Sequence, residues 1–255
     1  MVTETWILLR GLSRELGHWG AFVPRLRQTL GDAKVVPLDL PGVGACSDEP
    51  WPGTMAAAME SIRRRAAPWL GRGRVFVFGV SLGGMVAMEW AAHHPGELAG
   101  IVVGASSSAG LNPFWQRFHP AVVPRIVAAG LRGGPDGREA AIVRTVSNRR
   151  DLWAATTAAW CAIQRERPVS AATSRAQLTA AARWYAPLVL DVPALFLVGA
   201  TDRLVDAACS RALARRYRAP LVEHPTAGHD LTTDAPDWVA GELARWRADP
   251  ARARR

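Results

Sequence analysis

Lysine and cysteine are scarce in this sequence, and long apolar runs are missing from it. Lys34 is the only lysine among 31 basic residues. The three cysteines, Cys46, Cys161 and Cys209, are widely spaced and form no CxxC pair, which argues against a disulfide framework or a zinc site. No apolar run reaches the roughly 18 residues of a membrane span, and no basic segment precedes the short apolar run at the amino terminus. We expect a cytoplasmic protein without a membrane span or a bound metal.

The composition favours one large globular unit. The chain has 255 residues, of which 49% are hydrophobic and 21% charged, so the apolar fraction is too high for a mainly disordered protein. The formal net charge is +9. Residues 107–187 carry eleven arginines against four acidic residues, which either attracts an anionic partner or reflects a compositional bias toward arginine. No nucleic-acid-binding signature accompanies this charge, so nucleic acid is not an expected partner.

Short apolar strands alternate with amphipathic helices along most of the chain. The pattern predicts strands at 5–9, 35–40, 74–80, 101–103, 194–198 and 221–224, and helices at 19–30, 55–70, 82–93, 207–217 and 236–246. Such repeated units predict an α/β fold, with a mostly parallel sheet of about six strands and helices on both faces. Residues 107–187 break the pattern with helices alone. We expect residues 1–106 and 188–255 to form the core, and 107–187 a helical cap over the carboxyl edge of the sheet.

The strongest motif is Gly79-Val80-Ser81-Leu82-Gly83-Gly84. It follows a strand of the buried type and opens a helix, which is the context of a G-x-S-x-G nucleophile elbow. The tight turn requires small residues two positions before and after Ser81. The turn then lifts the serine hydroxyl above the sheet, and the N–H of Leu82 at the helix start can face a developing oxyanion. Ser81 is therefore the predicted nucleophile.

A serine nucleophile needs a base and an acid. His229 lies in a loop between the last strand and the last helix, where it can reach the carboxyl edge of the sheet. Asp202 follows the strand at 194–198 by a short turn and is the predicted acid. Asp206 is the competing candidate, although its position favours helix capping. The order Ser81, Asp202, His229 is the order expected in this fold.

A second oxyanion donor should come from the loop after the first strand. Gly11 allows a sharp turn there, and the N–H of Leu12 is the natural candidate. Leu12 and Leu82 together would form the oxyanion hole. Phe114 and Trp115 in the insertion, and Trp19 near the oxyanion loop, are candidate substrate-binding residues, although packing is an alternative role for each.

These motifs carry a family resemblance over nearly the whole chain. The segments LLRGL (8–12), DLPGVGACS (39–47), GVSLGG (79–84), LVGATDRLVD (197–206) and HPTAGHDL (224–231) resemble those of α/β-hydrolase-fold serine hydrolases. The nearest likeness is to small capped carboxylesterases, including the pimeloyl-ACP methyl ester esterases. The resemblance implies a Ser81-Asp202-His229 triad, two backbone oxyanion donors and no cofactor. One departure is Arg10 before Gly11, where the family commonly has histidine.

The expected function is hydrolysis of a carboxylic ester or thioester through an acyl-enzyme on Ser81. The expected substrate is a small-molecule ester, and an anionic or carrier-bound acyl group is one option for it. A serine at position 81 argues against dehalogenases and epoxide hydrolases of this fold, which need an aspartate there. Acyl transfer, cofactor-free haloperoxidase activity, or ligand binding without catalysis on the same fold remain alternatives.

Overall fold

A computed structural model describes residues 3–248 as a six-stranded, wholly parallel sheet with the strand order β2-β1-β3-β4-β5-β6. The strands are β1 (Glu4–Leu9), β2 (Lys34–Leu38), β3 (Arg74–Val80), β4 (Gly100–Gly104), β5 (Ala194–Gly199) and β6 (Leu221–His224). β3, which leads to Ser81, lies between β1 and β4 and is buried along nearly its whole length. The predicted α/β fold with about six strands is confirmed.

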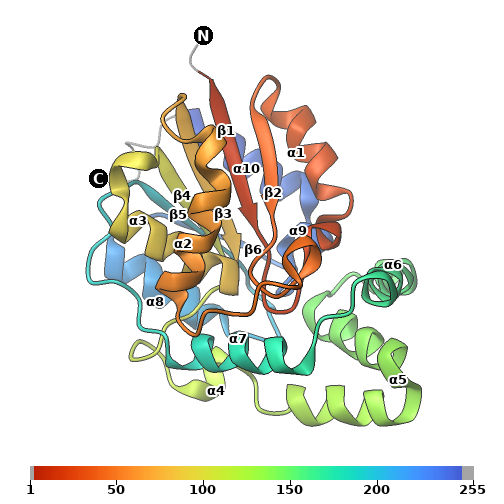
Figure 1. Ribbon diagram of the computed structural model, residues 1–255. Helices are drawn as coiled ribbons and strands as arrows, with labels where there is room; N and C mark the ends of the chain where they lie inside the picture. Colours follow the sequence, from red (N-terminus) through yellow and green to blue (C-terminus); the bar gives the residue numbers. More distant parts are fainter. Residues whose placement is uncertain (1–2, 249–255) are drawn as a thin grey trace.

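Helices cover both faces of the sheet because successive strand residues point to opposite sides. In β3, Phe76 and Phe78 pack in the layer that contains α1 (Phe22–Leu30) and α10 (Pro236–Ala248). Val75 and Val77 pack in the layer that contains α2 (Met55–Ala66), α3 (Leu82–His93) and α8 (Ala207–Tyr217). Figure 1 shows the helices on the two sides of the sheet.

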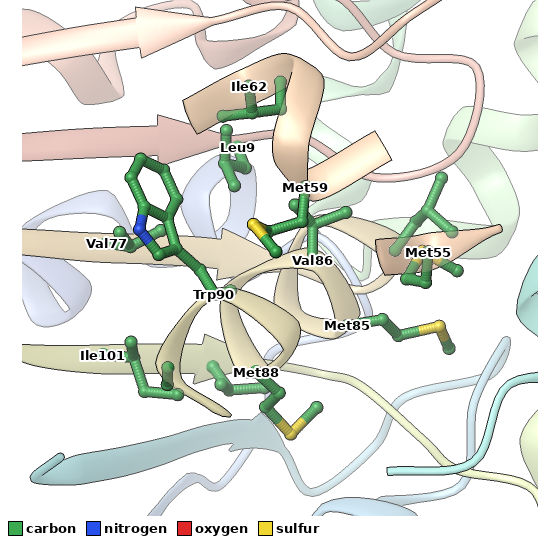
Figure 2. Close-up of a cluster of buried hydrophobic side chains, with 14 of the residues drawn as sticks. Leu9, Met55, Met59, Ile62, Val77, Met85, Val86, Met88, Trp90 and Ile101 are labelled. Carbon is green, nitrogen blue, oxygen red and sulfur yellow. The ribbon is translucent and has the colours of Figure 1, made fainter. Parts of the chain in front are cut away.

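The helix that begins after Ser81 is held firmly in the core. Ten of its residues, Leu82 to Ala91, are buried, because α3 packs against β3, β4 and α2. Figure 2 shows Met85, Met88 and Trp90 from α3 among the side chains of the neighbouring strands and α2. Trp90 also donates a hydrogen bond from Nε1 to Glu97 Oε2 at 2.9 Å. A fixed α3 gives the turn at Ser81 a rigid support.

Residues 107–187 contain no strand in the structure, which describes all of them. Their helices are α4 (Phe114–Arg117), α5 (Val122–Val146), α6 (Trp153–Glu166) and α7 (Ala171–Arg183). α5 is interrupted at Gly133 and Gly134, where the backbone leaves helical geometry. Figure 1 shows these helices beside the ends at which the strand arrows terminate. The division into a core and a separate cap stays a prediction.

Three predicted elements are shorter in the structure than expected. The first helix begins at Phe22 because Gly20 has a φ of 48° and separates it from a short 3-10 turn at Leu16–Trp19. The second strand ends at Leu38. The residue after it, Asp39, holds two loops with its carboxylate, which accepts hydrogen bonds from the N–H groups of Leu16 and Ala45. The second helix ends at Ala66 in a 3-10 turn. Within residues 3–248, no helix has the length and apolar character needed to cross a membrane.

Candidate active site

Ser81 lies in a sharp turn between β3 and α3. Its φ of 55° and ψ of −115° are unusual for a residue with a side chain. The main chain of Ser81 is fixed from three directions: its N–H donates to Gly104 O at 2.7 Å, and its carbonyl accepts from Ser106 Oγ and Gly84 N, each at 2.9 Å. The neighbouring strand and helix therefore hold the serine in a strained backbone conformation.

The glycines around Ser81 are required by close approach of the main chain. A Cβ on Gly79 would collide with the backbone of Gly83, and a Cβ on Gly83 would collide with the carbonyl oxygens of Leu9 and Arg10. Gly11 lies directly over the serine, since a Cβ built on it would be 3.8 Å from Ser81 Oγ. These contacts explain the spacing of the G-x-S-x-G motif in physical terms.

His229 and Asp202 are hydrogen-bonded to each other. His229 Nδ1 donates to Asp202 Oδ2 at 2.7 Å, and the two side chains are only 8% and 0% exposed. The other carboxylate oxygen of Asp202 accepts from the N–H groups of Leu204 and Val205 at 2.8 and 3.0 Å. Burial acts to lower the pKa of His229, but the charge and hydrogen bond of Asp202 outweigh it, so the pKa is raised above its usual value.

The competing carboxylate has another role. Asp206 caps α8 by accepting a hydrogen bond from Ala208 N at 2.8 Å. The structure thus pairs His229 with Asp202 and places Asp206 at a helix start.

The two predicted oxyanion donors border the same space as Ser81 and His229. Leu82 is the first residue of α3, so its N–H has no acceptor within the helix. Leu12 follows Gly11 in the loop after β1, and Gly11 itself lies close to Ser81. Leu12, Ser81, Leu82 and His229 all line one cavity. Their assignment as an oxyanion hole stays a prediction.

Arg10 forms a buried ion pair with Asp230, the residue after His229. The Arg10 Nη2–Asp230 Oδ2 distance is 2.6 Å, and the two side chains are 5% and 4% exposed. Arg10 Nη1 also donates to Asp230 Oδ1 at 3.2 Å and to Thr232 Oγ1 at 3.0 Å. Its guanidinium lies 4.9 Å from the ring centre of Trp19. Arg10 therefore ties the loop after β1 to the loop that carries His229, and the Arg10 charge lowers the pKa of Asp230 against the effect of burial.

Replacing Arg10 with methionine should destabilise the protein by about 3–5 kcal/mol at pH 7, because it leaves the carboxylate of Asp230 buried without a counterion. Denaturant unfolding monitored by tryptophan fluorescence would measure the change. The double variant Arg10→Met/Asp230→Asn removes both charges and should recover much of the loss. A single variant as stable as the original protein would contradict the structural role assigned to this pair.

The cavity has a volume of about 600 Å³ and is lined mainly by apolar side chains. The sheet side contributes Leu12, Val80 and Met85, and the segment between β4 and β5 contributes its own apolar groups, among them Phe114, Phe118, Val122, Ile126, Ile142, Trp160, Val169 and Leu178. An apolar cavity of this size with a few polar groups is typical of a small-molecule site.

Of the three aromatic residues predicted to bind substrate, Phe114 lines the cavity and the other two do not. Trp19 is only 3% exposed and packs against Phe22 and Phe78 in the core. Trp115 is 56% exposed and packs edge-on against Phe114 outside the cavity lining. The structure thus brings Phe114, but neither Trp19 nor Trp115, to the cavity wall, and substrate binding by any of the three stays a prediction. The one-turn helix α4 presents only one of two adjacent aromatic rings to the cavity.

Five charged residues of the cavity wall are not among the residues predicted from the sequence: Arg14, Arg117, Arg138, Glu139 and Asp230. Arg14 lies two residues beyond the predicted oxyanion donor, which is the only local signal that could have identified it. Glu139 is 125 positions away from Arg14, and no sequence pattern links the two. Within residues 3–248, no group of three histidine, cysteine, aspartate or glutamate side chains is arranged to hold a metal ion.

Comparisons with known proteins agree with this architecture. The model of the alpha/beta hydrolase family matches residues 7–242. The biotin biosynthesis bifunctional protein BioHC of Teredinibacter turnerae is 31% identical over 102 residues, which are 40% of this chain and 17% of that protein. The match thus spans less than a fifth of the relative's length.

Solved structures show the same fold at low sequence identity. An esterase from Thermogutta terrifontis has a TM-score of 0.72 at 22% identity, and the match covers 98% of this chain and 91% of that one. An enol-lactonase from Burkholderia xenovorans LB400 has a TM-score of 0.71 at 20% identity, and the match covers 96% of this chain and 92% of that one.

Proposed function

Since this chain belongs to the alpha/beta hydrolase family, we propose that it is a serine hydrolase that cleaves a carboxylic ester or thioester through an acyl-enzyme on Ser81. The observation that carries the proposal is the buried His229–Asp202 hydrogen bond of 2.7 Å, next to a cavity that Ser81 and His229 both line. A base held by a buried carboxylate beside a serine in a strained turn is the arrangement that activates a hydroxyl nucleophile.

In the first half of the reaction, Ser81 Oγ attacks the carbonyl carbon of the substrate and His229 Nε2 takes the hydroxyl proton. The carbonyl oxygen becomes an oxyanion, which the N–H groups of Leu12 and Leu82 stabilise. Asp202 holds the Nδ1 proton and stabilises the imidazolium. When the carbon–oxygen or carbon–sulfur bond breaks, Nε2 returns a proton to the leaving alcohol or thiol, and the acyl group stays on Ser81.

In the second half, a water molecule attacks the acyl-enzyme and gives a proton to His229 Nε2. The N–H groups of Leu12 and Leu82 also stabilise the oxyanion that forms in this step. Collapse of this intermediate breaks the bond to Ser81 Oγ, which takes the proton back, and the carboxylic acid leaves. Both halves use side chains and main-chain groups of this chain alone, and no cofactor enters the scheme.

The helices between β4 and β5 would act as a cap that supplies most of the acyl pocket. The cavity wall formed by Phe114, Phe118, Ile126 and Ile142 is apolar, and burial of a substrate chain there would exclude water from the attack. The excess of arginine in this segment would favour an anionic or carrier-bound acyl group on approach.

Hydrolysis of p-nitrophenyl acetate and butyrate tests the proposed function. We expect release of nitrophenolate, and inactivation by a fluorophosphonate with a single adduct on Ser81 identified by peptide mass spectrometry. Labelling at another serine, or turnover that survives complete labelling of Ser81, would contradict the acyl-enzyme assignment.

A further inference from the structure

One end of the cavity is lined by charged and polar side chains. Arg14 and Glu139 are 8% and 1% exposed, and both line the cavity together with Arg138, Gln164 and Trp160. A buried polar end in an otherwise apolar cavity is costly unless its groups are paired. The pairing of these side chains therefore indicates what the cavity is built to hold.

The guanidinium of Arg14 keeps donors that the protein does not use. Arg14 Nη1 donates to Glu139 Oε2 at 2.8 Å and lies 3.2 Å from His18 Nε2. No hydrogen bond from Nε or Nη2 of Arg14 to a residue in the range 3–248 is formed, although a guanidinium has five N–H donors. The guanidinium carbon lies over the ring of Trp160, 4.5 Å from the ring centre, a contact that helps to hold the guanidinium at the cavity wall.

The charges around Arg14 leave this end of the cavity positive. Glu139 is shared, since Arg138 Nη2 lies 3.7 Å from its second oxygen, so one carboxylate faces two guanidiniums. Burial, followed by the charges of Arg14 and Arg10, lowers the pKa of His18 to about 2 and keeps this histidine neutral.

The remaining cavity charges do not offset this excess. Arg10 and Asp230 neutralise each other. Arg117 also lines the cavity, and within the described part of the chain it donates to the carbonyl oxygens of Ala181 and Ala182 and to no carboxylate.

Arg14 is also fixed close to the reacting centre. The main-chain N–H of Arg14 donates to Gly11 O at 3.2 Å. This hydrogen bond closes a turn that begins at Gly11, beside Ser81. Ser13, inside this turn, has a φ of 57° and donates its N–H to Gln177 Oε1 at 2.8 Å. Arg14 therefore follows the candidate oxyanion donor Leu12 by two residues in a turn that α7 braces.

We propose that Arg14 forms a subsite for a carboxylate carried by the substrate, so that the preferred esters have an anionic group some distance from the bond that is cleaved. The unused donors of Arg14 would bind the carboxylate by charge-assisted hydrogen bonds. Because Glu139 is shared between Arg14 and Arg138, a net positive charge would remain to attract the carboxylate. This inference rests on the proposed function for its chemistry. The carboxylate can belong to the acyl part or to the alcohol part of the ester.

Matched ester pairs test this subsite. Monomethyl esters of straight-chain diacids, from succinate to suberate, carry the carboxylate in the acyl part, and methyl esters of monoacids with the same carbon numbers are the neutral partners. Acetate esters of hydroxy acids, against acetates of the matching alcohols, place the carboxylate in the alcohol part. For each pair we divide kcat/KM of the anionic ester by kcat/KM of its neutral partner. We expect this ratio to reach about ten or more in one of the two series, at one chain length. Ratios at or below one in both series would overturn the proposal.

Variants separate local binding from general attraction. Arg14→Met should lower the ratio about ten-fold, whereas Arg175→Met should leave it unchanged, because Arg175 is exposed on α7 and does not line the cavity. Glu139→Gln should raise the ratio, since it removes the competing carboxylate. The double variant Arg14→Met/Glu139→Gln leaves no uncompensated buried carboxylate, so it should fold and lack the preference. Equal losses in the Arg14 and Arg175 variants would contradict a local subsite.

Binding to the Ser81→Ala protein separates this inference from the proposed function. Calorimetry should show tighter binding of monomethyl adipate than of methyl hexanoate, and the difference should disappear in Ser81→Ala/Arg14→Met. If the original protein hydrolyses neither ester while this binding preference persists, the proposed function fails and the subsite stands. If neutral esters are hydrolysed and neither rate nor binding favours the anion, the subsite fails and the proposed function stands.

Discussion

Replacing Ser81 or His229 with alanine should each lower the turnover of p-nitrophenyl butyrate by about 10⁴-fold or more. Ser81→Ala removes the atom that forms the acyl-enzyme, and His229→Ala removes the base that takes the serine proton. The two losses should not add in the double variant, because either residue is ineffective without the other. Initial rates of the purified variants, compared with the uncatalysed reaction, measure the effect.

Folding controls make this result interpretable. His93→Ala is a suitable control histidine, because its side chain is 51% exposed at the end of α3 and away from the cavity lining. It should keep nearly full activity. The melting temperature of Ser81→Ala should match that of the original protein, since no hydrogen bond joins the Ser81 hydroxyl to another residue in the range 3–248. Near-normal activity in either Ser81→Ala or His229→Ala would remove that residue from the proposed triad.

Local sequence signals were sufficient to predict the fold, and they also select the residues to which we assign the proposed chemistry. The run from Val75 to Val80 is apolar on both faces, and a strand of this kind belongs inside a parallel sheet. The glycines at 79 and 83 are required by contacts with neighbouring backbone, so their spacing marks the turn even in a single sequence. Asp202 and His229 each follow a recognisable strand, which places them at the same sheet edge.

Contacts between distant segments could not be predicted in this way. Arg10 and Asp230 are separated by 220 positions and Arg14 and Glu139 by 125, and neither pair leaves a periodic pattern. The local motif at Arg10 showed only that the usual histidine is replaced. The structure adds the reason that arginine is tolerated at this position. The Arg10 guanidinium forms an ion pair with the carboxylate of Asp230, the residue after His229.

The aromatic residues illustrate the same limit. Trp19 is close in sequence to the oxyanion loop, but its indole packs in the core against Phe22 and Phe78. Phe114 and Trp115 are adjacent in α4, yet only Phe114 lines the cavity. Side-chain direction at loops and short helices depends on tertiary packing, which composition and periodicity do not contain.

Replacing the proposed triad acid, Asp202, with asparagine should lower turnover by about 10⁴-fold. Asp206→Asn should change turnover little. Asparagine at position 202 can donate a hydrogen bond to His229 Nδ1, which fixes the wrong tautomer and leaves Nε2 protonated and unable to accept the serine proton. Asparagine at position 206 still caps α8, because its amide oxygen replaces the carboxylate as acceptor. A reversed order of the two losses would show that the acid is assigned to the wrong residue.

The pH dependence gives this prediction a second and independent test. His229 acts as a base only when neutral, so kcat/KM should fall as the pH drops through the pKa of His229. The Asp202 carboxylate raises that pKa above its usual value, and the acidic limb of the original protein should therefore lie above about pH 6.5. Asp202→Asn removes the charge while burial remains, so the limb of its residual activity should move to lower pH. Asp206→Asn should leave the limb in place. A limb that stays fixed in Asp202→Asn would mean that another group controls the titration of the base.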